Sequence, residues 1–348
     1  MATKKRAEAQ PPRAKKIVGK VGLGIIGSGN FAKSVLVPAM TETGGFDVRG
    51  VVSALGLSAE AMKERTGAQY SATDAQAVFD DEDVDAVVIA TRHDSHAKYV
   101  LAALKRDLHV FVEKPLCLTR DELAAVEAAA RASKGILMVG FNRRFSPFVR
   151  DIGAHFAERT EPLAMIYRVN AGRIGLDSPS AWVHDVNVGG GRIIGEACHF
   201  IDTMQSLTGA HPVDLQVFGL NPRRSDLPAN DVVTMTIGFD DGSMGTLHYF
   251  ANGDTSFPKE RLEVFGQERI AVLDDYRTLE LTAGGRTVRK KSQTMQKGFA
   301  EEGRAFLEAC RTGEATVPLS ALIETTLVTL LAVEDLYGAW DETLDLGD

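Results

Sequence analysis

The chain has 348 residues, of which 44% are hydrophobic and 25% are charged. This balance is typical of a globular protein with an ample core, and the length favours two domains. The formal net charge of −8 argues against broad attraction to nucleic acid or to anionic membranes. No run of about 18 apolar residues is present, so the sequence predicts no membrane span.

The three cysteines lie far apart along the chain, at Cys117, Cys198 and Cys310, without Cys-X-X-Cys spacing. The pattern argues against a disulfide framework or a zinc ribbon, and it favours reduced thiols in a cytoplasmic protein. Residues 1–19 are rich in Lys and Arg and have no apolar run, so they are not a secretory signal. We expect a disordered basic tail there. A nucleic-acid-binding arm is the alternative, which no later segment supports.

The segment 20–142 alternates short apolar runs with helical periodicity. Strands are expected at 21–26, 48–53, 84–90, 109–112 and 136–140, with helices at 31–40, 58–66, 97–104 and 120–133. Ser58 is expected to cap the second helix and Gly67 to end it. The almost wholly apolar run Val84–Ala90 is typical of a parallel strand covered on both faces. The repeated βα units predict an α/β Rossmann domain with a doubly wound parallel sheet.

After residue 142 the pattern changes. Helices are expected at 143–159, within 191–207, at 299–312 and at 319–337, and strands at 163–169, 213–219, 232–239, 243–250, 261–265, 270–274 and 278–282. Tight turns such as Asp240-Asp241-Gly242 separate several of these strands. The segment 143–348 is therefore expected to form a second α/β domain around a large, mostly antiparallel, open sheet.

A glycine-rich turn follows the first strand and opens the first helix. It reads Gly27, Ser28, Gly29, Asn30, Phe31 and Ala32, which fits the dinucleotide-binding pattern G-X-G-X-X-A. Such a turn brings backbone N–H groups and a helix N-terminus to a pyrophosphate. The second strand ends at Ser53 with no acidic residue and no following arginine. Because a serine hydroxyl can bond either a ribose hydroxyl or a phosphate, the sequence leaves NAD and NADP open.

The fourth expected strand, 109–112, leads directly into Glu113-Lys114-Pro115. Ligands of doubly wound sheets bind at the carboxyl ends of strands. A lysine at that place can bond a hydroxyl oxygen of a substrate and stabilise the negative charge that develops as hydride leaves. Pro115 restricts the backbone there, and a cis peptide is one way in which it can do so. The alternative is a surface ion pair before a loop.

Four further segments accompany this triplet, and together they resemble the signature of the Gfo/Idh/MocA oxidoreductases. They are the phosphate-binding turn, Thr91 followed by His96, the run Gly140–Phe145, and Gly189-Gly190-Gly191 before a helix with His199 and Asp202. The resemblance implies a Rossmann domain followed by a mostly antiparallel domain that binds substrate and commonly builds oligomers through its open sheet. It also implies that Lys114 is the catalytic or substrate-orienting lysine. Thr91, His93, His96 and Glu113 would then lie near the cofactor.

Two sequence segments resemble a particular group of proteins with this fold. Thr91–His96 and Arg192–Asp202 depart from the usual family pattern. Both resemble the C-terminal halves of bi-domain proteins in which an alcohol dehydrogenase-like unit is fused to this fold. The resemblance implies that this chain corresponds to such a second half.

The helix with His199 offers a general base. In many members of the family an Asp lies four residues before this histidine, where this chain has Gly195. Glu196 and Asp202 each lie three residues from His199, so either could hold the imidazole. We expect His199 and Glu196 to act with Lys114 in catalysis. A buried structural histidine is the alternative, and no metal site is expected because no third ligand has defined spacing.

Other candidate substrate-binding residues in the second domain belong to residue types that bind sugar hydroxyls. They are Arg144, Asn170, Arg173, Trp182, His184 and Asn252. Trp182 could stack on a pyranose face, whereas surface or packing roles are the alternative for each.

The sequence thus predicts a cytoplasmic NAD(P)-dependent oxidoreductase that transfers hydride to or from a carbon bearing a hydroxyl group. The resemblance implies a sugar, cyclitol or nucleotide sugar as substrate, and a homodimer or homotetramer built through the second sheet. Two alternatives come from other classes: a redox-cycling glycosidase that retains NAD, and a non-catalytic dinucleotide-sensing regulator. Retention of both Lys114 and His199 argues against the regulator.

Overall fold

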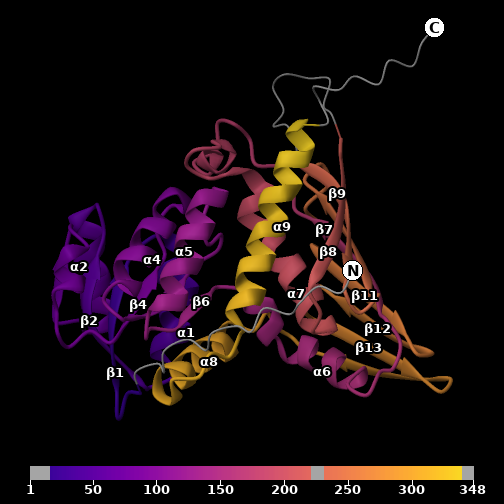
Figure 1. The fold of residues 1–348 in the computed structure, drawn as a ribbon, viewed down its shortest axis with the longest axis horizontal. Coiled ribbons are helices and arrows are strands. Elements are labelled where there is room, and N and C mark those ends of the chain that lie inside the picture. The colour runs from indigo at the N-terminus through magenta and orange to yellow at the C-terminus, as the bar shows by residue number, and fades with distance from the viewer. Residues whose placement is uncertain (1–15, 221–230, 339–348) are drawn as a thin grey trace, which may run out of the picture.

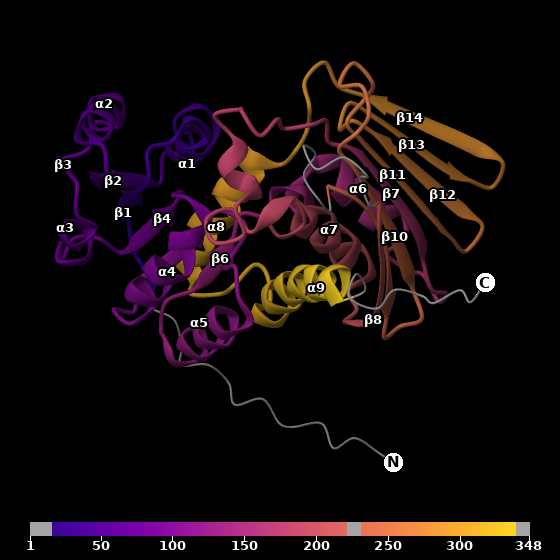
Figure 2. The same cartoon turned by 90° about the horizontal axis from the view of Figure 1, so that it is seen from above.

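The computed structural model describes residues 16–220 and 231–338. Two sheets stand apart, with helices between them and around the first (Figures 1 and 2). Apart from its last four residues, the predicted N-terminal tail lies outside the described part of the chain. No helix within the described ranges is long and apolar enough to cross a membrane.

The first sheet is parallel throughout and has the order β3-β2-β1-β4-β5-β6. Its strands are β1 (Val21–Ile26), β2 (Phe46–Val52), β3 (Tyr70–Ala72), β4 (Ala86–Ile89), β5 (His109–Val112) and β6 (Leu137–Val139). The predicted parallel sheet is confirmed. β3 was not predicted, because three half-buried residues show no hydrophobic period. The strand order reverses between β1 and β4, because β2 and β3 are added on one side of β1 and β4, β5 and β6 on the other. Ligands of such sheets bind at this switch point.

The second sheet has eight strands in the order β14-β13-β12-β11-β7-β10-β9-β8. They are β7 (Ala164–Asn170), β8 (Pro212–Gly219), β9 (Val232–Phe239), β10 (Met244–Phe250), β11 (Glu260–Gly266), β12 (Arg269–Asp274), β13 (Thr278–Ala283) and β14 (Arg286–Lys291). All neighbours are antiparallel except β10 and β7, so the predicted mostly antiparallel sheet is confirmed. β14 was missed because all six of its residues are exposed and four are Arg or Lys.

Apart from the four-residue α3, which was not predicted, the helices match the predicted ones in place, with differences at their ends. They are α1 (Val37–Thr41), α2 (Gly56–Thr66), α3 (Gln76–Phe79), α4 (His96–Leu104), α5 (Arg120–Ala132), α6 (Pro147–His155), α7 (Cys198–Thr208), α8 (Phe299–Thr312) and α9 (Leu319–Gly338). One long helix predicted at 143–159 is instead a 3₁₀ turn followed by α6, because Pro147 cannot continue a helix and Ser146 caps the new one.

The prediction that Ser58 caps α2 is wrong. The helix begins at Gly56, and the residue before it, Leu55, has no side chain that could cap it. The Ser58 hydroxyl instead bonds the hydroxyls of Ser53, at 3.1 Å, and Ser28. Gly67 ends the helix in the left-handed conformation, as predicted.

Two hydrophobic cores underlie the two sheets. Helix α8 contributes to the first core, and α9 contributes to both. α8 packs on the first core through Phe306, whose ring meets Phe46 and Phe111 at 6.0 and 5.5 Å between centroids. α9 places Leu322 and Leu330 in the first core, and its buried residues Val328 and Ala332 lie in the second. Figure 1 shows α9 standing between the Rossmann helices and the second sheet. A domain boundary placed after residue 142 therefore separates the two sheets, but it does not separate the two hydrophobic cores.

The helices of the second domain cover one face of its sheet. In Figures 1 and 2, α6, α7 and α9 all lie on the side towards the Rossmann domain, and none of the helices that the structure describes covers the other face. Apolar side chains on that face, including Ile166, Met244 and Ile270, are 36–49% exposed.

We expect Phe306→Ala to destabilise the protein by about 3–5 kcal/mol, because it removes a fully buried ring that joins α8 to two other rings. Chemical denaturation measures the loss. Phe257→Ala is the matched control: its ring is 59% exposed and contacts the Arg168 guanidinium, so we expect a loss below about 1 kcal/mol. Equal losses in the two variants would contradict the assignment of α8 to the first core.

Candidate active site

A cavity of about 1110 Å³ extends along the carboxyl ends of the first sheet and reaches the second domain. Its wall includes the whole glycine-rich turn, the end of β2, the loops after β4 and β5, and the start of α7. The second domain also contributes Lys259 and Lys297 from loops distant in sequence. Residues predicted for cofactor and for catalysis thus line one continuous space.

The glycine-rich turn has the geometry of a pyrophosphate-binding turn. Gly27 has φ +107°, and a Cβ there would lie 2.3 Å from the carbonyl oxygen of Ala90. A Cβ at Gly29 would meet no atom within 4 Å, so the space beside this backbone is open towards the cavity. Ala32 is fully buried against the sheet, as the pattern requires. The helix that follows offers its free N–H groups to an anion, so the residues present fit a dinucleotide.

Three serine hydroxyls meet at the end of β2. Ser53 and Ser28 both bond Ser58, so the predicted ribose contact is part of a small hydroxyl cluster. Ser53 and Ser28 line the cavity together with Ala54 and Leu55, and no acidic residue lies at this end of β2. Ser58 was missed as part of this cluster because its position near a helix start suggested a cap.

The loop after β4 connects the domains. Thr91 and His93 line the cavity, and His96 lies buried at the start of α4 with its Nδ1 donating to the carbonyl of Pro115 at 2.7 Å. His93 Nδ1 lies 2.8 Å from the carbonyl of Gly189 in the second domain. Burial, and then the charge of Lys114, lowers the pKa of His93 to about 3, so this ring is neutral and donates that bond.

Glu113 and Lys114 stand at the end of β5, on the cavity wall. The Lys114–Pro115 peptide bond is cis. The Lys114 ammonium donates to the carbonyl of Gly195 at 2.9 Å, which holds it beside the start of α7. Burial raises the pKa of Glu113 to about 7, although the neighbouring Lys114 opposes that shift. Gly140 leaves room for this carboxyl group, since a Cβ there would lie 3.0 Å from its oxygen.

His199 lies 8% exposed on the cavity wall, and its Nδ1 is buried without a hydrogen-bond partner. Burial holds its pKa well below the ordinary value. Four cationic side chains add to this effect: Arg143, Lys114, Lys259 and Lys297. The imidazole is therefore neutral and can accept a proton.

The expectation that Glu196 or Asp202 orients His199 is wrong, because each carboxylate has other partners. Asp202 is fully buried and pairs with Arg144, whose Nε lies 2.8 Å from its Oδ2. Glu196 accepts from Tyr249 at 3.1 Å and pairs with Arg192 at 3.4 Å and Lys259 at 3.5 Å. Helical spacing placed these groups near the imidazole, but it could not show which cations compete for them.

Glu196 is nonetheless part of the site. Burial alone would raise its pKa, but three positive charges outweigh burial and lower it to about 2, those of Lys259, Lys114 and Arg192. It lies in a π-helical turn, Ile193–Ala197, and a second such turn, Ala32–Leu36, follows the phosphate-binding segment. Single π-turns are frequent at functional sites, and here both border the cavity.

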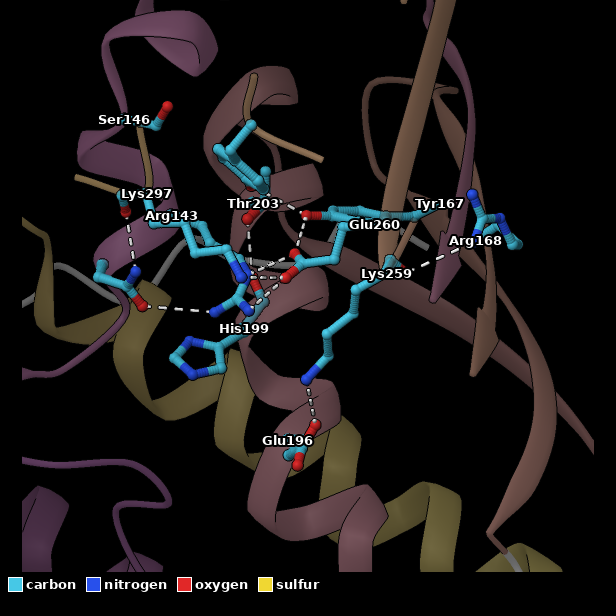
Figure 3. A network of polar contacts seen from close by, with 12 residues as sticks. Arg143, Ser146, Tyr167, Arg168, Glu196, His199, Thr203, Lys259, Glu260 and Lys297 are labelled. Atoms are coloured by element: carbon cyan, nitrogen blue, oxygen red, sulfur yellow. Dashed lines mark hydrogen bonds and ion pairs between the residues drawn. The ribbon is translucent and has the colours of Figure 1, made fainter. Parts of the chain in front are cut away.

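A buried ionic network supports this wall (Figure 3). Arg143 forms two bonds to Glu260, at 2.7 and 2.8 Å, and Lys297 donates to the same carboxylate at 2.9 Å. Tyr167 donates to it as well, at 3.0 Å. Arg143, Lys259 and Lys297 line the cavity and were not predicted. The run Gly140–Phe145 was noted, but the sequence could not show which of its two arginines faces the site.

Three predicted substrate residues lie outside the cavity wall, as do Arg173 and Asn252. Arg144 is paired with Asp202, and the Asn170 amide donates to the carbonyl of Asp254 at 2.7 Å. His184 Nε2 lies 3.1 Å from the carbonyl of Ile174. Arg144 thus holds its 3₁₀ turn to α7, while Asn170 and His184 hold loops of the second domain. Trp182 does line the cavity, with its ring against His93 at 4.8 Å between centroids.

No group of three or more His, Cys, Asp or Glu residues is placed to hold a metal ion within 16–220 and 231–338. All three cysteines are buried and unpaired.

Comparisons with known proteins agree with this architecture. The model of the oxidoreductase family with an NAD-binding Rossmann fold matches residues 21–141, and that of the Gfo/Idh/MocA C-terminal domain matches residues 164–272. The chain is 28% identical over 262 residues to the 1,5-anhydro-D-fructose reductase of Ensifer adhaerens, which covers 70% of this chain and 73% of the relative. It is 25% identical over 319 residues to the inositol 2-dehydrogenase of Rhizobium meliloti, covering 86% and 91%.

A solved structure of levoglucosan dehydrogenase in complex with NADH and levoglucosan has the same fold. It aligns with a TM-score of 0.78 at 21% identity, covering 92% of this chain and 98% of that one. The chain therefore belongs to the Gfo/Idh/MocA family of oxidoreductases, with an NAD-binding Rossmann domain followed by the family's C-terminal domain.

Proposed function

We propose that this oxidoreductase acts on the CH–OH group of a sugar, a cyclitol or a nucleotide sugar, with Lys114 and His199 at the reacting carbon. The observation behind the proposal is the cavity that joins the glycine-rich turn to these two side chains. Relatives named for inositol and for anhydro sugars are consistent with such substrates.

The cofactor would be held by the first domain. The backbone from Gly27 to Ala32 fits the pyrophosphate, and the hydroxyl cluster at Ser53 fits a ribose. Thr91, His93 and Glu113 line the path from there to Lys114. When bound, the nicotinamide supplies or takes up the hydride.

Lys114 is proposed to hold the substrate oxygen. Its ammonium has three N–H donors, and one of them is used by the carbonyl of Gly195 at 2.9 Å. The remaining donors can bond a hydroxyl oxygen and stabilise the negative charge that develops on it as the carbon is oxidised. The bond to Gly195 fixes the lysine against α7 and hence near His199.

His199 is proposed to take the hydroxyl proton. The carbon loses a hydride and the oxygen loses a proton, so the substrate becomes a carbonyl and the imidazole becomes an imidazolium. A neutral ring on the cavity wall can accept this proton, and the depressed pKa of His199 keeps it neutral. In the reverse direction the imidazolium returns the proton to the alkoxide.

Trp182 and Glu196 are proposed to bind the rest of the substrate. Glu196 is ionised and lines the cavity, so it can accept bonds from sugar hydroxyls. Trp182 offers an aromatic face of the kind on which a pyranose packs, while His93 and the Arg92 guanidinium hold its ring.

Three further points belong to this proposal. The unpaired cysteines favour a cytoplasmic location. The segments Thr91–His96 and Arg192–Asp202 remain the basis for relating the chain to the second halves of bi-domain oxidoreductases.

The face of the second sheet that no described helix covers, with Ile166, Met244 and Ile270 exposed, is proposed as the interface of a homodimer or homotetramer.

We expect Lys114→Ala to lower kcat/KM on the order of a thousandfold, because the developing charge loses its bound cation. The assay follows reduced-nicotinamide absorbance with NAD and NADP in parallel, across sugars, cyclitols and nucleotide sugars. Lys105→Ala, an exposed lysine at the end of α4, should leave kcat/KM unchanged. A Lys114→Ala protein with full turnover would refute the assignment. Tight cofactor binding without any oxidation would favour the sensor, and glycoside cleavage without added NAD would favour the glycosidase.

The proposed interface predicts a mass of two or four times 37.5 kDa in solution by light scattering. Replacing Ile166 by Glu should shift the protein towards the monomer, because a charge would then be buried between apolar faces. Leu57→Glu, at a 91% exposed position on α2, is the control. A wild-type monomer would contradict this interface.

A further inference from the structure

Cationic side chains outnumber carboxylates at the part of the cavity that surrounds His199. Lys114, Arg143, Lys259 and Lys297 line the wall there. Figure 3 shows Lys259 and Lys297 approaching this region from separate segments of the second domain, on either side of the Arg143–Glu260 pair. The proposed function gives neither lysine a part in holding the cofactor or in taking the hydroxyl proton.

The carboxylates of this region are shared between cations. Glu260 bonds both Arg143 and Lys297. Glu196 is paired with Lys259 and also with Arg192, which lies outside the cavity wall. The remaining carboxyl group on the wall nearby, Glu113, has a pKa of about 7 because of its burial and is only partly ionised at neutral pH. Positive charge is therefore left uncompensated around the imidazole.

Both lysines keep donors that no described residue uses. The Lys297 ammonium has its ion pair with Glu260 at 2.9 Å, and its side chain is 16% exposed. The Lys259 ammonium has its ion pair with Glu196 at 3.5 Å, and its side chain is 38% exposed. An ammonium group offers three N–H donors, so each lysine can bond a further oxygen within the cavity.

We propose that the substrate carries a carboxylate and that Lys259 and Lys297 bind it, which makes the substrate a sugar acid rather than a neutral sugar or cyclitol. This inference rests on the proposed function, since it concerns the substrate of the same site. A neutral hydroxyl could bond these lysines but could not offset their charge, which becomes costly once a bound substrate displaces the water around them. A single negative charge fits best, because Glu196 lies beside Lys259 and would repel a doubly charged phosphate.

The bound carboxylate would also affect the proposed base. Lys259 and Lys297 are among the charges that depress the pKa of His199. A negative group placed between them and the imidazole would offset that effect and raise the basicity of the ring. The same group would therefore both select the substrate and improve proton transfer from its hydroxyl.

The test is a calorimetric titration of the whole protein saturated with NADH, a complex that cannot oxidise a hydroxyl group. The probes are matched pairs, D-glucuronate with D-glucose and D-galacturonate with D-galactose. We expect at least one acid to bind tenfold or more tightly than its neutral partner. Lys259→Gln should weaken binding of that acid about tenfold without changing the neutral partner, and Lys259→Arg should restore it.

Lys290→Gln is the matched control, since Lys290 pairs with Asp151 away from the cavity and should leave both affinities unchanged. Lys297→Gln is a second variant with the same expected loss, and denaturation shows whether it still folds. Equal or tighter binding of the neutral sugars, no binding of either acid, or an equal loss for both members of a pair in Lys259→Gln would overturn the inference.

Turnover separates this inference from the proposed function. Oxidation of neutral sugars with no preference for acids would leave the proposed function standing and remove the carboxylate site. Lysine-dependent binding of an acid, without oxidation of any substrate, would support the carboxylate site and count against the proposed function.

Discussion

The buried ion pair between Arg143 and Glu260 joins the turn that follows the first sheet to a strand of the second sheet. Arg143 lies in the 3₁₀ turn directly after the last strand of the first sheet, and Glu260 is the first residue of β11 in the second. The pair is almost fully buried, and Lys297 and Tyr167 bond the same carboxylate. Removal of one member of such a pair leaves a buried charge without a partner and costs about 3–5 kcal/mol. The pair therefore fixes where the second domain sits relative to the ends of the Rossmann strands.

The position of the site follows from that constraint. The loops after β4 and β5 supply His93 and Lys114, and both contact the second domain through backbone carbonyls, those of Gly189 and Gly195. These bonds place the start of α7, and with it His199, against the end of β5. Polar, directional contacts between the two domains thus border the cavity. Such contacts suit a site that must hold a cofactor, a substrate and a catalytic side chain in a defined arrangement.

Much of this could be predicted from the sequence because the relevant signals are local. The turn from Gly27 to Ala32 and the triplet around Lys114 each follow the end of a strand, and each contains residue types that suit one function at that place. Both motifs line the cavity. Periodicity predicted the two sheets. It missed β14, where an exposed edge strand rich in Arg and Lys has no apolar face to detect.

The errors concern pairing between distant segments. His199 and Asp202 have the right spacing on one helix, but Arg144 takes the carboxylate. Lys259 and Lys297 enter the site from loops far apart in the chain, with no local pattern to identify them. A sequence shows which groups are charged, whereas only the fold shows which charges compete for the same partner.

The central claim is that one cavity holds a dinucleotide with its reactive end at Lys114 and His199. A crystal structure of the protein with bound NADH tests it most directly. The account predicts the pyrophosphate on the backbone between Gly27 and Ala32 and the nicotinamide beside the Lys114 ammonium. A pyrophosphate bound elsewhere, or a nicotinamide directed away from Lys114, would contradict the account.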